Sequence, residues 1–204
     1  MIYKVKAILA LGKVYDISMR MIAKHDLRSH LALVINAASG DRVLDIGCGT
    51  ASILKHLPNV SYLGIDFSPK YIARAKKQYG ERGEFRCVSV DELSIESSER
   101  FDRILMLGVI HHLNNEQVES LMKVINGLLI ETGQLITHDP VFVQGQNKIA
   151  KFFLKNDRGS FVRYEQEYVE LIESSMKVTE HRIETKMLRI PYSILFTTSE
   201  KRVK

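Results

Sequence analysis

The segment Val43-Leu44-Asp45-Ile46-Gly47-Cys48-Gly49-Thr50-Ala51 joins an apolar run to a glycine-rich turn. The apolar run predicts a short buried strand over 42–46, and the turn predicts that a helix follows at once. Glycine permits positive φ and lets a ligand approach the backbone closely. Because ligands of open α/β sheets bind beyond the carboxyl ends of the strands, this turn is the first candidate for a binding site.

Strands and helices alternate along the chain after this turn. We predict strands over 60–65, 84–90, 101–107 and 134–137, and helices over 50–57, 68–79 and 115–130. Alternation of this kind, with right-handed crossovers, predicts a parallel sheet that carries helices on both faces. The apolar run 104–107 is typical of a strand that is buried on both faces.

The regions on either side of this core have different patterns. Apolar residues at helical spacing predict a helix over 13–39, which Ser39-Gly40-Asp41 ends. After Pro140, we expect residues 145–176 to be helical and irregular. Residues 177–186 and 188–198 are expected to form two tightly joined antiparallel strands at the sheet edge.

The predicted fold class is α/β, with a doubly wound, mostly parallel seven-stranded sheet and a final antiparallel hairpin strand. A chain of 204 residues suits a single domain of this kind. We expect that domain to contain an N-terminal helical cap (1–39), a ligand-binding core (41–140) and a last part (141–204) with further helices and the C-terminal strand pair.

Composition excludes several classes of protein. A hydrophobic content of 45% and a charged content of 26% are ordinary for a globular chain and argue against disorder. The net charge of +5 is too small to indicate a nucleic-acid binder by itself. The two cysteines, Cys48 and Cys87, form no metal or redox motif and no disulfide framework, which fits a reducing cytoplasm.

No segment predicts a membrane span, because no apolar run approaches the ~18 residues that one needs. The apolar run 7–12 near the start is also too short for a signal peptide, and Lys13 follows it directly. We therefore expect a cytoplasmic protein, and an N-terminal helix that lies on a membrane surface stays open as an alternative. The sequence gives no indication of oligomeric state.

Acidic residues end three successive strands: Asp45, Asp66 and Asp91. The dinucleotide fingerprint G-x-G-x-x-G fails at Ser52, and no Gly-Lys-Ser/Thr follows to complete a P-loop. An acid directly before the turn is awkward for a pyrophosphate and suits a ligand with an ammonium and a sulfonium. Asp66 is placed to accept hydrogen bonds from ribose hydroxyls, and Asp91 to reach an adenine amino group. Any one of these acids alone is also a candidate helix N-cap.

These segments together resemble the motifs of class I methyltransferases that depend on S-adenosylmethionine (SAM). The matching segments are Asp45-Ile-Gly-Cys-Gly-Thr, Gly64-Ile-Asp66-Phe-Ser, Val90-Asp91-Glu92-Leu93, the run from Phe101-Asp102 to Gly108-Val-Ile-His111-His112-Leu113, and Leu128-Leu-Ile-Glu-Thr-Gly133-Gln-Leu-Ile. The resemblance covers residues 41–140 and implies that this core binds SAM. Two departures are mild: Ala51 replaces a third glycine, and Glu131-Thr132 replaces Pro-Gly.

The resemblance also implies which residues contact the cofactor. Tyr15 is expected to cover it from the N-terminal helix, although a plain core aromatic is an equal alternative. The backbone near Leu107 and Gly108 is expected to contact its methionine end. The implied set is Tyr15, Asp45, Gly47, Cys48, Gly49, Asp66, Phe67, Asp91, Glu92, Leu107 and Gly108.

Candidate catalytic residues follow the fourth strand. His111 and His112 lie beside the expected methyl position, and the ordinary pKa of histidine, ~6.5, suits a general base at neutral pH. A structural role, with one histidine bonding a backbone carbonyl, has equal weight. His138 and Asp139 end the fifth strand and are second candidates for acceptor binding. No recognised ligand spacing predicts a metal site.

Acceptor selection is expected in the N-terminal helix and in residues 140–192. The stretch 148–163 mixes lysine and arginine with phenylalanine, as a surface that grips an anionic or aromatic acceptor would. An amphipathic helix that packs its phenylalanines on the core is the favoured alternative. Arg189 and Tyr192, in the final hairpin, are further candidates to reach the acceptor.

The predicted function is methyl transfer from SAM to a small-molecule acceptor: a metabolite, a sugar or a lipid precursor. Residues 107–110 stand where methylators of nucleic-acid amines often carry an Asn/Asp-Pro-Pro-Tyr/Phe motif, so we expect no DNA substrate and disfavour RNA. A non-catalytic SAM-binding protein and an RNA-directed methyltransferase remain alternatives. A nicotinamide oxidoreductase is disfavoured by Asp45 and Ser52.

Overall fold

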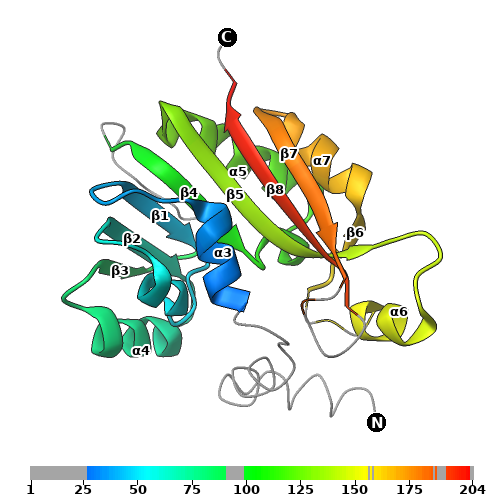
Figure 1. The fold of residues 1–204 in the computed structure, drawn as a ribbon, viewed down its shortest axis with the longest axis horizontal. Helices are drawn as coiled ribbons and strands as arrows, with labels where there is room; N and C mark the ends of the chain where they lie inside the picture. Colours follow the sequence, from blue (N-terminus) through cyan, green and yellow to red (C-terminus); the bar gives the residue numbers. More distant parts are fainter. Residues whose placement is uncertain are drawn as a thin grey trace.

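A computed structural model describes residues 27–90, 99–155, 157, 159–185, 187 and 192–202. One mixed sheet forms the centre of the molecule, with the strand order β3-β2-β1-β4-β5-β8-β7 (Figure 1). The parallel strands are β1 (Arg42–Ile46), β2 (Ser61–Asp66), β3 (Glu84–Cys87), β4 (Phe101–Leu107) and β5 (Leu129–Phe142). Strand β8 (Ile194–Lys201) runs antiparallel between β5 and β7 (Met176–Glu184), and the short β6 (Arg163–Tyr164) pairs with the end of β5. This arrangement confirms the predicted fold class.

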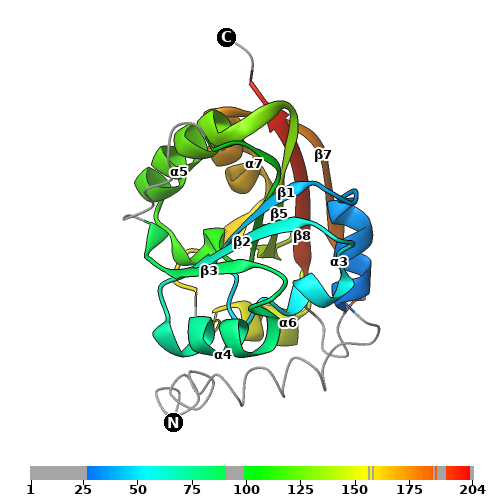
Figure 2. The same ribbon diagram turned by 90° about the vertical axis from the view of Figure 1, so that its left-hand side faces the viewer.

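Helices cover both faces of the sheet, as Figure 2 shows. Helix α3 (Leu27–Ile35), the 3-10 helix η1 (Ser52–His56) and α4 (Pro69–Tyr79) pack on one face. Helices α5 (Asn115–Leu128) and α7 (Glu165–Glu173) pack on the other. Helix α6 (Lys148–Lys155) lies beyond the carboxyl end of β5 (Figure 1). Among the described residues, no helix has the length and apolar character to cross a membrane.

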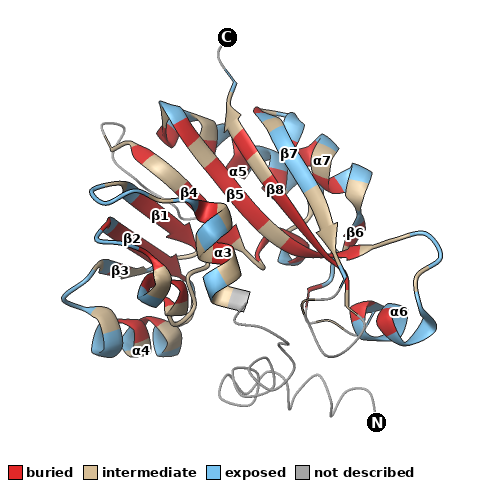
Figure 3. Ribbon diagram, in the orientation of Figure 1, coloured by how far each residue is buried: buried red, intermediate tan, exposed pale blue. Residues whose placement is uncertain are grey.

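Each face of the sheet is buried in its own apolar core (Figure 3). In β1, Leu44 faces the α5 side and Val43 the α3 side, because successive strand residues point to opposite faces. Both residues are fully buried, as are Ile104 and Leu105 in β4. The sheet therefore holds the carboxyl ends of β1, β4 and β5 on a rigid platform.

Local signals start two helices where the sequence predicts them. The Ser68 side chain accepts a hydrogen bond from the amide of Tyr71 and caps α4, which begins with Pro69. Asn114 and Gln117 form a capping box at the start of α5. These caps satisfy amide groups that have no partner within the helix.

The predicted ends of several elements are wrong. Helix α3 ends at Ile35 instead of reaching Ser39, because Asn36 adopts a left-handed φ of 46° that stops the helix. The predicted helix 50–57 is the short 3-10 helix η1, and β3 ends at Cys87 instead of at residue 90. Propensity alone does not show where a left-handed residue falls, which accounts for the first error.

The second half of the chain departs further from the prediction. Strand β5 extends over Leu129–Phe142 and begins directly after α5, so Gly133 lies inside the strand instead of starting it. The irregular region 145–176 contains α6, β6 and α7. The antiparallel pairing at the sheet edge is confirmed, with Glu184 opposite Ile194, whereas most of the expected tight joint (186 and 188–191) lies outside the described residues.

Candidate functional site

The glycine turn after β1 is held against the end of β2. The amides of Gly47 and Cys48 both donate to the carbonyl oxygen of Ile65, at 2.8 and 2.9 Å. Gly47 has φ 73°, and a Cβ at that position would lie 2.6 Å from Cγ2 of Val109. Both the backbone conformation and the packing of Val109 therefore require glycine here.

The second glycine of the turn leaves open space beside the backbone. Gly49 has φ 55°, and no heavy atom among those considered lies within 4 Å of the place where its Cβ would stand. Ala51, which stands where the methyltransferases that this sequence resembles have a third glycine, also has a left-handed φ of 54°. Replacing glycine by alanine here therefore costs about 1 kcal/mol, because a non-glycine residue is held in the left-handed conformation. The extra volume of the alanine methyl group matters less than this backbone cost.

Asp45 is buried at the end of β1, with 2% of its surface exposed. The hydroxyl of Tyr62 donates to its Oδ2 at 2.5 Å, whereas Oδ1 is buried and has no hydrogen-bond partner. Burial raises the pKa of this carboxyl to about 7, against the hydrogen bond from Tyr62, which lowers it. An unpaired buried carboxylate oxygen is costly, so the site favours a donor or a positive charge beside Asp45.

Asp66 joins the end of β2 to the glycine turn. Its Oδ2 accepts from the amide of Gly49 at 3.0 Å and its Oδ1 from the amide of Ser68 at 2.8 Å. Burial raises the pKa of Asp66, and these two hydrogen bonds act in the opposite direction. The next side chain, Phe67, is 77% exposed, so its ring offers an open face for stacking.

The end of β4 connects this turn to the histidines. Gly108 has φ 78°, its amide donates to the carbonyl oxygen of His138 at 2.7 Å, and its Cβ position is 3.7 Å from Cε1 of His111. The predicted contacts Leu107 and Gly108 therefore lie between the glycine turn and His111. The other predicted residues Tyr15, Asp91, Glu92 and Arg189 lie outside the described residues.

His111, in the short 3-10 helix η3 (Ile110–His112), is buried between two carboxylates. Its Nδ1 lies 2.7 Å from Oδ1 of Asp139, and its Nε2 lies 3.3 Å from Oδ1 of Asp157. The His111 amide also donates to Asp139 at 3.1 Å. Two acidic partners from different segments thus fix the position and orientation of the imidazole ring.

The charge on His111 follows from these partners. Burial lowers its pKa, but the hydrogen bonds and charges of Asp139 and Asp157 outweigh burial and raise it to about 9. Burial likewise raises the pKa of Asp157, but His111 and the other hydrogen-bond donors hold it at about 2. A raised pKa favours the protonated form of His111 at neutral pH, and so favours a positioning role for His111 over that of a general base.

Asp157 was missed by the sequence reasoning. Its Oδ1 also accepts from the amide of Gly159 at 2.8 Å, and its Oδ2 accepts from the hydroxyl of Tyr192 at 2.7 Å. A Cβ on Gly159 would lie 2.0 Å from Cδ2 of His111, so only glycine fits beneath the ring. No spacing in the sequence connects residue 157 with residue 111, because the contact depends on how the segment after α6 folds back.

His138 and Asp139 point to opposite faces of β5, as neighbouring strand residues must. Asp139 faces His111, whereas the His138 ring packs edge-on against Phe196, with 5.5 Å between ring centroids. Burial lowers the pKa of His138, and its Nδ1 is buried without a hydrogen-bond partner. The two predicted acceptor contacts therefore lie on opposite faces of β5, and the strand continues past them to Phe142 instead of ending there.

His112 is exposed, and its ring centroid lies 4.1 Å from that of His111. It is the member of the histidine pair that is open to solvent. Tyr192, through its bond to Asp157, lies in the same network as His111. The structure thus brings together His111, Asp139 and Tyr192 from the predicted set, and adds Asp157.

The basic and aromatic stretch 148–163 does not form the single core-packed helix that was favoured. Phe152 and Phe153 on α6 are 58% and 40% exposed, and Phe161 after it is 40% exposed. Arg163 is buried and donates to the carbonyl oxygens of Ile110 and Leu113, at 3.2 and 2.7 Å. Arg163 therefore supports the turn that carries the two histidines.

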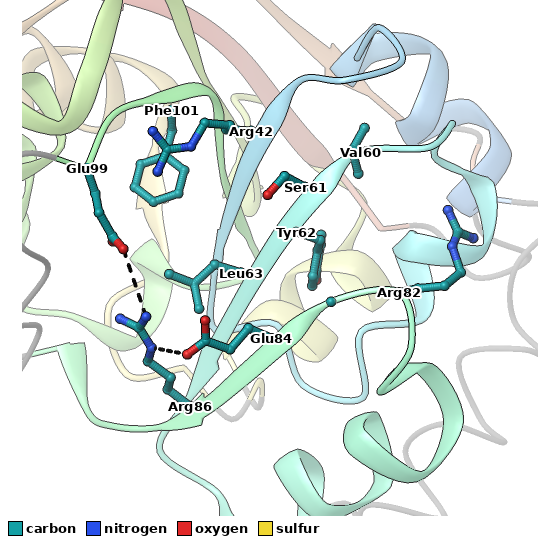
Figure 4. Close-up of a pocket in the computed structure, with 11 residues that line it drawn as sticks. Arg42, Val60, Ser61, Tyr62, Leu63, Arg82, Glu84, Arg86, Glu99 and Phe101 are labelled. Carbon is teal, nitrogen blue, oxygen red and sulfur yellow. Dashed lines mark hydrogen bonds and ion pairs between the residues drawn. The ribbon is translucent and has the colours of Figure 1, made fainter.

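A separate hollow lies near the amino ends of the strands. It is lined by arginines and acids that include Arg86, which bonds Glu84 at 2.6 Å and approaches Glu99 at 4.0 Å (Figure 4). Arg42, at the start of β1, also borders it. Its position at the opposite strand ends separates it from the glycine turn and from His111.

Comparisons with known proteins agree with this geometry. Residues 44–135 match the family model described as a methyltransferase domain. A ubiquinone biosynthesis O-methyltransferase of Bradyrhizobium diazoefficiens is 34% identical over 110 residues, which are 52% of this chain and 40% of that protein. A malonyl-(acyl-carrier protein) O-methyltransferase of Bacillus cytotoxicus is 34% identical over 114 residues, 53% of this chain and 39% of that protein. The chain thus covers less than half of either relative.

A solved structure shares the fold. N-methyltransferase NodS from Bradyrhizobium japonicum, in complex with S-adenosyl-L-homocysteine, superposes with a TM-score of 0.68 at 16% identity, over 86% of each chain. The chain therefore has the Rossmann-like fold of this N-methyltransferase. The match of residues 44–135 to a methyltransferase domain, with the motifs described above, implies SAM as the cofactor to test against this site.

The residues present fit this cofactor. SAM carries an ammonium and a sulfonium, and the buried, unpaired Oδ1 of Asp45 is an acceptor that favours such charges. The open backbone at Gly49 and the exposed ring of Phe67 leave room for a nucleoside next to Asp66. The two carboxylates lie at the ends of adjacent strands. They attract a cationic ligand and would repel a pyrophosphate.

Proposed function

We propose that this protein transfers the methyl group of SAM to a small-molecule acceptor: a metabolite, a sugar or a lipid precursor. The observation that carries the proposal is the glycine turn edged by two buried carboxylates, Asp45 and Asp66. The names of the two curated relatives, both O-methyltransferases, support an acceptor of this kind.

Cofactor binding is assigned as follows. Asp66 accepts hydrogen bonds from the ribose hydroxyls, Phe67 stacks on the adenine, and Asp45 compensates the positive charge. Backbone at Leu107 and Gly108 meets the methionine end, and Cys48 lies in the turn between the two glycines. Tyr15, Asp91 and Glu92 remain predicted contacts of the same cofactor.

SAM supplies a methyl group that is already activated on its sulfonium, so the protein's task is chiefly to position the acceptor. In this proposal His111 is a positioning residue: as a cation it draws Asp139 and Asp157 together and fixes the turn at the end of β4. His112, exposed on the same turn, accepts the proton that an acceptor hydroxyl or amine releases. His138, Asp139, Arg189 and Tyr192 remain predicted contacts of the acceptor.

The test is transfer of a radiolabelled methyl group from SAM to a panel of hydroxyl-bearing and amine-bearing metabolites, sugars and lipid precursors. We expect His112→Ala to lower kcat by about 100-fold while KM for SAM stays unchanged, since a general base contributes about 10²–10⁴-fold. His111→Gln is expected to shift the pH profile and change KM for the acceptor. Equal activity of both variants and the unchanged protein would overturn these roles.

Two other outcomes separate the alternatives. Heat of SAM binding without transfer to any acceptor in the panel would favour a non-catalytic SAM-binding protein. Filter binding to tRNA with a steep salt dependence would favour an RNA substrate, because phosphate contacts release counterions. Transfer to a small acceptor with no salt-dependent tRNA binding supports the proposal.

A further inference from the structure

Helix α6 presents its largest apolar side chains to solvent. Two of its eight residues point inward: Ala150 and Leu154 are buried, with 3% and 1% of their surfaces exposed. Ile149 and Phe152 are each 58% exposed, and Phe153 is 40% exposed. A surface helix usually turns its bulky apolar residues to the core, so this orientation points to a binding function for the outer face.

The exposed apolar residues form one stripe along the helix. Positions 149, 152 and 153 are spaced i, i+3, i+4 and so lie on the same face. The rings of Phe152 and Phe153 lie edge to face, with 6.0 Å between centroids. We call Ile149, Phe152 and Phe153 the α6 stripe.

Lysines border the α6 stripe. Lys148, Lys151 and Lys155 are exposed, their spacing of i, i+3, i+7 gives a second row along the same helix, and residues 148–155 contain no acid. A row of bulky apolar side chains next to a row of lysines is the pattern of a helix that lies in the interface of an anionic bilayer. The apolar row enters the headgroup region, and the lysines meet the negative lipid phosphates.

We propose that α6 docks this protein on the surface of a membrane that contains anionic lipids. The helix lies beyond the carboxyl end of β5 (Figure 1). The glycine turn and His111 follow the carboxyl ends of β1 and β4, which belong to the same set of parallel strands. Just past its end, Asp157 bonds both His111 and Tyr192. Docking through α6 therefore places the acceptor side of the site next to the bilayer. The proposal does not depend on methyl transfer and is tested without it.

Sedimentation of the full chain with lipid vesicles tests the proposal. One set of vesicles contains phosphatidylcholine alone, and the other contains one third phosphatidylglycerol. We expect binding to the anionic vesicles that is at least about tenfold stronger and that weakens as salt is raised. A double variant, Ile149→Ser with Phe153→Ser, is expected to lose about tenfold or more of this binding. A triple variant with Gln at 148, 151 and 155 is expected to lose the preference for anionic vesicles.

The matched control is Leu33→Ser on α3, because Leu33 is 77% exposed and lies outside α6. We expect this variant to bind vesicles like the unchanged protein. Circular dichroism and thermal melting confirm that each variant folds. The proposal is overturned by equal binding to both vesicle types, by no binding, or by equal losses in the Leu33 control. It is also overturned if the α6 variants instead abolish a dimer in solution, because the stripe would then bind a second copy of the chain.

Discussion

The proposed cofactor side and the proposed acceptor side of this site are built by different means. The glycine turn, Asp45 and Asp66 lie at the ends of neighbouring parallel strands, and backbone hydrogen bonds to Ile65 and Gly49 fix them. The acceptor side is held by side chains: a buried cation, His111, joins carboxylates from β5 and from the segment after α6. The first depends on backbone geometry and the second on charge, so the two regions should respond differently to substitution and to pH.

The largest effect is expected from Asp139→Ala. This change leaves His111 buried beside only one carboxylate and removes the acceptor of its amide. Breaking a buried ion pair costs about 3–5 kcal/mol, so we expect the free energy of unfolding to fall by roughly 3 kcal/mol. Urea denaturation measures it. A loss below about 1 kcal/mol would show that charge does not hold the acceptor side.

The pH dependence of stability is expected to separate the two regions. The folded pKa of His111, about 9, is above that of unfolded histidine, so its contribution is complete below pH ~6.5 and is lost as pH rises through 9. The amplitude is about 3 kcal/mol at most. Asp45, with a folded pKa of about 7, makes stability fall as pH rises between about 4 and 7.

Thermal melts at a series of pH values check this separation. His111→Gln is expected to remove the decline between pH 6.5 and 9 and to leave the decline at lower pH. If the decline above pH 7 is the same in both proteins, His111 is not the group that titrates.

Gly47→Ala tests the backbone of the cofactor side. The new Cβ would meet Val109 at 2.6 Å, and φ of 73° is unfavourable for alanine, so we expect a loss of about 2 kcal/mol. The matched control is Gly127→Ala in α5, where no heavy atom lies within 4 Å of the new Cβ. That change is expected to stabilise by about 0.5–1 kcal/mol because alanine favours helix. Equal effects at the two glycines would contradict the requirement at Gly47.

Tyr192→Phe removes the hydroxyl that bonds Asp157. We expect a loss of about 1 kcal/mol or slightly more, since the hydrogen bond has a charged acceptor. A double-mutant cycle with Asp157→Asn measures the coupling of the two side chains. Strictly additive effects would show that they do not act as a pair.

The smallest effect is expected from Ala51→Gly. Glycine relieves a left-handed φ of 54°, a gain of about 1 kcal/mol, but removes a fully buried methyl group, a loss of ~0.8 kcal/mol. Denaturation midpoints within experimental error of each other are therefore expected. A change above about 1 kcal/mol in either direction would show that one of these two contributions has been misjudged.

The sequence predicted where the glycine turn, Asp45 and Asp66 lie, because each of them is tied to the end of a strand. Alternation of strands and helices gave the parallel sheet, and the acid before Gly47 and the acid at residue 66 follow from that topology. It missed Asp157 and the contact of this residue with His111, since that contact joins residues 46 positions apart in an irregular region. It also placed the phenylalanines of α6 in the core, because helical spacing alone does not say which face turns inward.

The most direct test of the carboxylate-edged turn is calorimetric titration of the full chain with SAM at pH 8. We expect micromolar binding by the unchanged protein, and a loss of at least about tenfold in affinity for Asp66→Asn but not for the exposed control Glu180→Gln. We also expect affinity to fall as the pH drops below 7, where Asp45 takes up a proton. No heat and no thermal shift at millimolar SAM would contradict the account.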